Sequence, residues 1–245
     1  MKILFVGATR GMGRSLARLM AARGDSLCLL GRDAEALALS AKDLEIRGAS
    51  GPVTTVPCDL ADEGSIVPAV DQADEALGGF DTVVITAGVF ATQEVLEQDT
   101  ALRARLLTVN FSNTIQLCEA VRGRLLERGG GTLCVFSSVA GERGRKPVGL
   151  YGATKSGLSH YLESLDHRHR AEGLVTVTVK PGFVKTSMTE GLDPPPFAGE
   201  PDGVAVRVLK AIDRGWPVVY CPAIWGWIML VIRWLPRAVM RRIGF

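Results

Sequence analysis

Histidine and cysteine are scarce in this sequence, which disfavours metal centres and disulfide frameworks. The 245 residues include 3 histidines and 5 cysteines, and no two cysteines form a C-x-x-C pair. An odd number of widely spaced cysteines predicts reduced thiols in a core. His160, His167 and His169 lie in or near one expected helix, where alternate residues point apart, so we expect surface histidines and no metal site.

A strong charge of either sign and a long apolar run are also lacking. With 28 basic and 26 acidic residues the formal net charge is +2, which gives no reason to expect a nucleic-acid partner. The apolar run from Ala223 to Ile232 is far shorter than the ~20 residues needed to span a bilayer. The chain opens on a strand-like run at Lys2, without the charged and apolar segments of a secretory signal. We therefore expect the main body in the cytoplasm.

Apolar strand candidates alternate with helix-length segments. They cover residues 3–6, 27–30, 53–56, 82–85, 132–136, 175–179 and 218–220. Parallel neighbours need crossover connections that cover the sheet, so this alternation indicates a parallel sheet buried on both faces. We expect an α/β fold: one doubly wound Rossmann-type domain over residues 1–222 with about seven strands, then an apolar, basic helical tail over residues 223–245.

The stretch from 186 to 201 is the weakest for regular structure, because three consecutive prolines and several glycines interrupt any period. A loop of that length inside a compact domain is either disordered or functional, and a substrate lid is one such function. Both interpretations stay open.

A glycine-rich turn follows the first strand. The segment Gly7-Ala-Thr-Arg-Gly-Met-Gly13 leads into the first helix. Small residues let the backbone approach a pyrophosphate there, and a helix N-terminus supplies free N–H donors. The spacing differs from G-x-G-x-x-G, and such turns also serve only to change direction. Its place directly after the first strand favours the nucleotide interpretation.

The second strand ends in Gly31-Arg-Asp33, where dinucleotide folds hold the adenosine ribose. Arg32 is joined there by Arg10 from the glycine turn, and two guanidinium groups suit a 2′-phosphate. NADPH is therefore the expected cofactor, although Asp33 offers the opposing interpretation because it could bind a ribose hydroxyl. Asp59, after the third strand, could accept from the adenine amino group.

A tyrosine and a lysine stand four residues apart at the start of an expected helix. In Tyr151-Gly-Ala-Thr-Lys155 they share one helical face. A nearby ammonium favours the phenolate, so we expect a lowered tyrosine pKa and an acid that protonates a carbonyl oxygen as hydride arrives at the carbon. Ser138, at the end of the fifth strand, could hold that oxygen. The spacing alone occurs by chance in amphipathic helices, but here it follows the other features in the order a nucleotide fold requires.

Taken together, these motifs resemble the short-chain dehydrogenase/reductase family from Lys2 to about Met188. The resemblance implies a catalytic set in which Asn110 organises a proton-relay water, Ser138 positions the substrate, Tyr151 is the acid and Lys155 also binds the nicotinamide ribose. It implies the cofactor-binding residues Gly7, Thr9, Arg10, Gly11, Met12, Gly13, Arg32, Asp59, Leu60, Ala87, Gly88, Tyr151, Lys155, Pro181, Gly182, Val184 and Thr186. The family also pairs the Tyr151 helix with its copy, so a homodimer or homotetramer is expected.

Two positions depart from the usual pattern of the family. Val6 stands where a threonine usually precedes the first glycine, and Ile85-Thr-Ala-Gly88 replaces Asn-Asn-Ala-Gly. These positions brace the sheet, so the departures bear on local stability more than on chemistry.

The tail holds tryptophans, aliphatic residues and four arginines with no acid. This composition fits a segment that lies in a bilayer interface, on the inner face of the cell membrane, or a helix that covers the core or a subunit interface. The segments from Phe136 to Arg143, from Tyr151 to Leu158 and from Ile228 to Arg237 resemble the family's decaprenylphosphoryl-2-keto-pentose reductases, which implies a lipid-linked keto-sugar as substrate. The alternatives are a β-ketoacyl thioester or small ketone, or a non-catalytic NADP sensor or scaffold.

Overall fold

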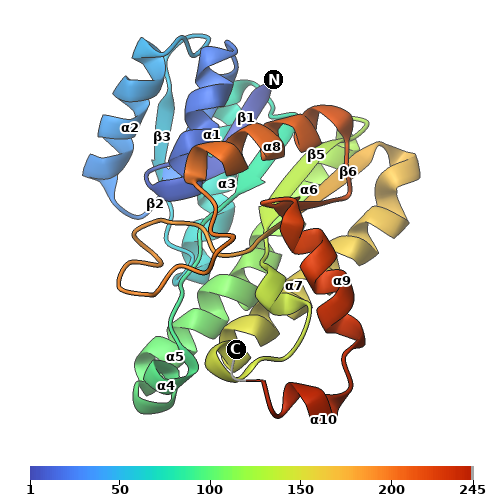
Figure 1. Ribbon diagram of the computed structural model, residues 1–245. Coiled ribbons are helices and arrows are strands. Elements are labelled where there is room, and N and C mark those ends of the chain that lie inside the picture. The colour runs from blue at the N-terminus through green and yellow to red at the C-terminus, as the bar shows by residue number, and fades with distance from the viewer. Residues whose placement is uncertain (244–245) are drawn as a thin grey trace.

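The computed structural model describes residues 1–243 and contains one sheet of seven parallel strands in the order β3-β2-β1-β4-β5-β6-β7 (Figure 1). The expected doubly wound α/β fold is confirmed. The strands are β1 (Lys2–Val6), β2 (Ser26–Gly31), β3 (Thr54–Pro57), β4 (Thr82–Ile85), β5 (Gly131–Phe136), β6 (Leu174–Pro181) and β7 (Val218–Cys221).

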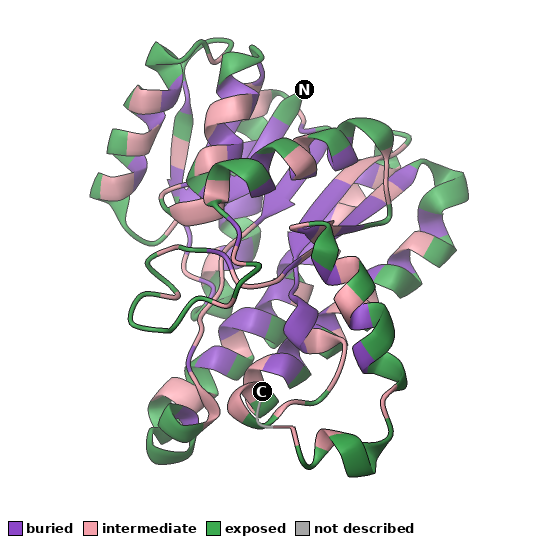
Figure 2. Cartoon of the chain, in the orientation of Figure 1, coloured by how far each residue is buried: buried purple, intermediate pink, exposed green. Residues whose placement is uncertain are grey.

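Helices cover both faces of the sheet. The main helices are α1 (Gly11–Ala22), α2 (Ala34–Ile46), α3 (Ile66–Leu77), α4 (Gln93–Gln98), α5 (Thr100–Leu107), α6 (Asn113–Glu127), α7 (Gly149–His169), α8 (Pro201–Arg214), α9 (Ile224–Trp234) and α10 (Arg237–Met240). One core lies between the sheet and α1, α2 and α8, and a second lies between the sheet and α3, α6 and α7. Strands β1, β2, β4, β5 and β6 are mostly buried (Figure 2), because crossover helices shield both faces of the sheet, whereas only Val56 of the edge strand β3 is buried.

The strand order reverses between β1 and β4. These are the first strands of the two halves of the sheet, β1–β3 and β4–β7. In open α/β sheets the ligand binds outside the carboxyl ends of the strands at such a reversal. The segments that follow β1 and β4 begin with Gly7 and Thr86, so the predicted glycine turn lies at the point of reversal.

The histidines of α7 are buried or exposed according to the helical face on which they lie. Leu158, Leu162 and Leu165 are buried in the core, and His169 continues the same spacing by four residues. His169 is 5% exposed, and its Nδ1 lies 2.9 Å from Glu172 Oε1. The expectation of a surface position is therefore wrong for His169, whereas His160 is exposed. The helical period that buries the leucines also buries this ring.

The chain between β6 and α8 forms an irregular loop whose ends are tied together. Lys185 N donates to Gly199 O at 2.9 Å, and Gly199 N donates to Phe183 O at 2.8 Å. A single parallel bridge joins Val184 to Gly199. The role of this loop as a lid stays a prediction.

The tail forms α9 and α10. Three residues of α9, Trp225, Met229 and Ile232, are buried against Phe183 and other side chains of the domain. Within residues 1–243, no helix combines the length and the apolar character needed to cross a membrane.

Candidate active site

The glycine turn is shaped by close backbone contacts. Gly7 has φ +94°, which favours glycine, and a Cβ added to Gly13 would lie 2.2 Å from Gly7 O. Arg10, in extended conformation, precedes α1, and no side chain caps this helix end. The turn therefore leaves backbone N–H groups of the first helical turn directed at the space beyond β1.

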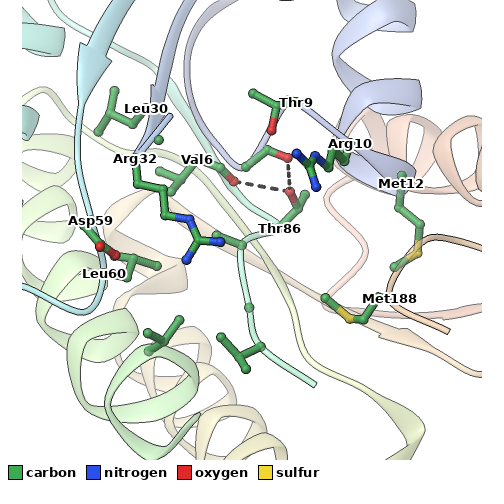
Figure 3. A pocket seen from close by; sticks show the side chains of 18 of the residues that line it. Val6, Thr9, Arg10, Met12, Leu30, Arg32, Asp59, Leu60, Thr86 and Met188 are labelled. Carbon is green, nitrogen blue, oxygen red and sulfur yellow. Dashed lines mark hydrogen bonds between the residues drawn. The ribbon is translucent and has the colours of Figure 1, made fainter. Parts of the chain in front are cut away.

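Thr86 joins the ends of β1 and β4. Its Oγ1 donates to Gly7 O at 2.9 Å and lies 3.3 Å from Val6 O, as the dashed lines in Figure 3 show. Thr86, which stands where the family usually has asparagine, thus stabilises the glycine turn through its hydroxyl. The hydroxyl holds the segment after β4 against the glycine turn after β1.

A cavity of about 340 Å³ lies over the glycine turn. Of the predicted cofactor-binding residues, it is lined by Gly7, Thr9, Arg10, Gly11, Met12, Gly13, Arg32, Asp59, Leu60, Ala87, Gly88 and Thr186. In Figure 3, Arg10 and Arg32 reach the cavity from the ends of β1 and β2. Neither arginine side chain has a hydrogen bond or ion pair with another residue of the described chain.

Asp33 is not among the residues that line this cavity. Its Oδ1 accepts a hydrogen bond from Ala36 N at 3.0 Å, so the carboxylate caps α2. The capping position gives this acid a structural partner. Asp59 does line the cavity, and its Oδ1 accepts from Ala61 N at 2.9 Å.

Sequence reasoning missed Arg105, which lines the same cavity from the exposed side of α5. No local motif marks it, because α5 reaches the cavity only through the packing of the chain beyond β4. Sequence reasoning also missed other lining residues, including Cys58, Val89, Val109 and Met188.

A second cavity of about 480 Å³ contains the predicted catalytic side chains Ser138, Tyr151 and Lys155. Met12, Gly88 and Thr186 line both cavities, which shows that the two adjoin. The remaining predicted cofactor residues, Pro181, Gly182 and Val184, line the second cavity. Most of its other walls are apolar, with Phe90, Val139, Phe183, Leu192 and Trp225 among them.

Lys155 is held in the first turns of α7 by the end of β5. Its side chain is buried, and Nζ donates to Phe136 O at 2.9 Å. Ser137 Oγ donates to Lys155 O at 2.9 Å and lies 2.7 Å from Ser159 Oγ. These contacts fix the start of α7 against β5 and thereby fix the lysine beneath Tyr151, whose ring centroid is 5.9 Å from Nζ.

The pKa values of the pair follow from burial. Removal from water raises the pKa of Tyr151 to about 12, and a hydrogen bond from Ser138 and the charge of Arg145 partly oppose this. Burial lowers the pKa of Lys155 to about 8. The expectation of a lowered tyrosine pKa is therefore wrong, because desolvation outweighs the neighbouring charges. At neutral pH the phenol keeps its proton and can donate it.

Ser138 and Asn110 are also fixed by hydrogen bonds. Ser138 Oγ accepts from Ala140 N at 3.1 Å and lies 3.4 Å from Pro181 O. Asn110 lies in the π-helical turn η2 (Thr108–Ser112), lines neither cavity, and exchanges two hydrogen bonds with the backbone of Val89, at 2.7 and 2.6 Å.

Asn110 nevertheless adjoins the lysine. A Cβ added to Gly88 would lie 3.2 Å from Asn110 Oδ1 and 3.8 Å from Lys155 Nζ. Gly88 thus stands between the two side chains, and its lack of a side chain leaves room there. The relay role of Asn110 stays a prediction.

Comparison with known proteins places the chain among oxidoreductases. Residues 1–195 match the family model described as short chain dehydrogenase. An uncharacterized oxidoreductase of Mycobacterium tuberculosis (strain H37Rv) is 32% identical over 240 residues, covering 98% of this chain and 96% of that protein. Carbonyl reductase family member 4 of Xenopus tropicalis is 27% identical over 233 residues, covering 92% and 93%.

A solved structure is similar as well. A short-chain type dehydrogenase/reductase from Mycobacterium ulcerans superposes with a TM-score of 0.80 at 25% identity, covering 89% of this chain and 86% of that chain.

Proposed function

The chain belongs to the short-chain dehydrogenase family, whose members use an NAD(P) nucleotide, and on that premise we propose that it reduces a ketone with NADPH. The observation that carries the proposal is the shared wall of the two cavities. Ser138, Tyr151 and Lys155 line an apolar cavity that adjoins the glycine-lined cavity at Met12, Gly88 and Thr186. A carbonyl beside Tyr151 would thus lie next to the nucleotide end of the site.

The residues present fit a dinucleotide. The cradle at Gly7 and Gly13 has no room for a side chain, and the uncapped start of α1 suits a pyrophosphate. Gly7, Gly11 and Gly13 would hold the phosphates, and Thr186 would contact the nicotinamide amide. When bound, NADPH supplies the hydride for the carbonyl carbon.

The chain's own residues supply the proton. The Tyr151 phenol, protonated at neutral pH, donates its proton to the carbonyl oxygen as that oxygen gains negative charge. Ser138 Oγ, which already lies in the same cavity wall, donates a hydrogen bond to that oxygen. The Lys155 ammonium stabilises the phenolate that remains.

The choice of NADPH over NADH rests on three residues. Arg10 and Arg32 line the nucleotide cavity, and their charges suit a 2′-phosphate. Asp33, the residue that favours a free ribose, does not line this cavity, and its Oδ1 caps α2. Arg105 adds a third positive charge to the cavity.

An amphiphilic substrate suits the second cavity. Its walls are mainly aliphatic and aromatic, while Arg145 and Asp193 provide polar groups. This mixture supports a substrate with a polar keto group and an apolar portion, such as the lipid-linked keto-sugar implied by the sequence resemblance. The carbonyl reductase of Xenopus tropicalis, similar over nearly its whole length, is consistent with the reaction class.

A substrate panel tests this function. NADPH oxidation would be measured with a polyprenyl-phosphate keto-sugar, the same keto-sugar without lipid, a β-ketoacyl thioester and a small ketone. We expect turnover of the lipid-linked ketone with kcat/KM about tenfold or more above the lipid-free sugar, since each buried CH₂ contributes about 0.8 kcal/mol. Turnover of only the thioester or the small ketone would reject the proposed substrate class. NADPH binding without turnover of any of them would reject the enzyme and support a sensor.

A further inference from the structure

Helix α9 has two apolar faces, and only one of them is covered. Trp225, Met229 and Ile232 are buried against the domain. Trp227 and Trp234, one at each end of the opposite face, are 71% and 82% exposed. Leu230 and Val231, also exposed, complete this outer face at helical spacing. In Figure 2, exposed residues run along the outer side of α9.

The charged residues of the tail all have one sign. Residues 221–245 contain four arginines and no acid. Arg237, Arg241 and Arg242 are exposed. The fourth, Arg233, lies 3.2 Å from Glu142 Oε2 through its Nη1 and is also solvent-accessible. Three exposed cations therefore follow the exposed Trp234 in the chain.

Hydrogen bonds hold the tail against the domain and so fix the orientation of the outer face of α9. Arg143 Nη2 donates to Leu235 O at 2.7 Å, and Lys146 Nζ donates to Arg241 O at 2.8 Å. These bonds hold backbone atoms of the tail, so the side chains of Trp234 and Arg241 remain directed outward. The outer face is a surface of the folded protein and not a segment that has come loose.

We propose that the outer face of α9, with Arg237, Arg241 and Arg242, docks on the surface of an anionic lipid bilayer. Exposed tryptophans and aliphatic residues bury in the interface of a membrane, and arginines pair with its phosphates. Eleven helical residues are too few to span the bilayer, so α9 lies along the surface.

Charge argues against a second copy of the chain as the occupant. A two-fold interface brings the same patch of both subunits together. Such a contact at α9 would place the arginine cluster of one copy near that of the other, with no acid in residues 221–245 of either to compensate. An anionic membrane offers the opposite charge over the whole patch.

The same helix forms part of the wall of the second cavity. Trp225 lines that cavity, and its ring packs so closely on Gly182 that a Cβ there would lie 2.1 Å from Trp225 Nε1. Docking through the outer face would therefore place the substrate cavity at the membrane surface, where a lipid-anchored ketone resides. This last step rests on the proposed function, whereas the docking itself does not.

Vesicle flotation of the full chain tests the docking. The probes are vesicles of phosphatidylcholine alone and of phosphatidylcholine mixed with phosphatidylglycerol. We expect binding to the mixed vesicles that weakens as salt rises. The double variant Trp227→Ser/Trp234→Ser should lose about tenfold or more in partitioning. The matched control Leu39→Ser/Ile46→Ser removes residues that are 64% and 87% exposed on α2, and it should bind as wild type.

A charge variant separates the two contributions. Arg237→Gln/Arg241→Gln/Arg242→Gln should lose on the order of 100-fold in affinity for the mixed vesicles, at about fivefold per basic residue. Circular dichroism and thermal unfolding establish that each variant is folded. Equal flotation of wild type and the tryptophan variant would overturn the proposal. So would the absence of vesicle binding together with a dimer that the tryptophan variant disrupts. Because flotation needs no turnover, failure of the proposed reaction would not affect this result.

Discussion

Replacing Lys155 by methionine should stabilise the fold at neutral pH. The side chain is 5% exposed, and burial lowers its pKa from 10.5 to about 8. At about 1.36 kcal/mol per pH unit, the charged lysine costs about 3 kcal/mol of folding free energy at pH 7. The unfolded chain binds this proton more tightly than the folded one. The cost is therefore fully present below about pH 8 and disappears as the pH rises toward 10.5.

Methionine keeps a side chain of similar length and removes the charge. It also removes the 2.9 Å hydrogen bond from Nζ to Phe136 O. The loss of this bond reduces the gain in folding free energy by about 1 kcal/mol. The net expectation is a variant about 2 kcal/mol more stable at pH 7 and close to wild type at pH 10. Reduction of the ketone should be lost, because nothing would stabilise the phenolate of Tyr151.

Urea unfolding at pH 7 and pH 10 measures both quantities. The free energies of unfolding of wild type and Lys155→Met should differ at pH 7 and converge at pH 10. A variant that is no more stable at pH 7, or a difference that does not change with pH, would refute the claim that a buried, destabilising ammonium sits beneath the tyrosine.

Four further substitutions probe other parts of the site. Arg10→Ala and Arg32→Ala should each lower kcat/KM for NADPH by about tenfold or more while leaving that for NADH unchanged, and an unchanged NADPH/NADH ratio would reject their role. Gly13→Ala should abolish dinucleotide binding in a fluorescence titration because its Cβ would overlap a carbonyl of the turn, whereas Gly203→Ala, in open space, should bind normally. Asn110→Leu should lower the free energy of unfolding by about 2 kcal/mol or more, since two backbone groups after β4 lose their partners; a neutral effect would show that water replaces the amide.

The fold and most of the site could be predicted from sequence because their signals are local. Each strand is a short apolar run, and the turn at Gly7 and the spacing of Tyr151 and Lys155 are visible within a few residues. The carboxyl ends of parallel strands lie at one edge of a sheet, so chain order alone brings these motifs together.

What sequence reasoning missed depends on tertiary packing. Asp33 suits a ribose or a helix cap equally, and only the start of α2 decides for the cap. Arg105 reaches the nucleotide cavity from a helix that no motif marks. The pKa of Tyr151 is raised because the fold excludes water from the phenol. The four-residue spacing of Tyr151 and Lys155 in the sequence gives no information on that burial.

We propose that the Tyr151 phenol supplies the proton for ketone reduction. Tyr151→Phe removes only the hydroxyl and keeps the ring that packs edge-on against Phe90 at 5.0 Å. The decisive measurement is single-turnover oxidation of bound NADPH by the preferred ketone of the panel, with NADPH affinity measured in the same samples. We expect NADPH affinity within about twofold of wild type and hydride transfer slower by about 10²–10⁴-fold. Hydride transfer at the wild-type rate in Tyr151→Phe would contradict this proposal.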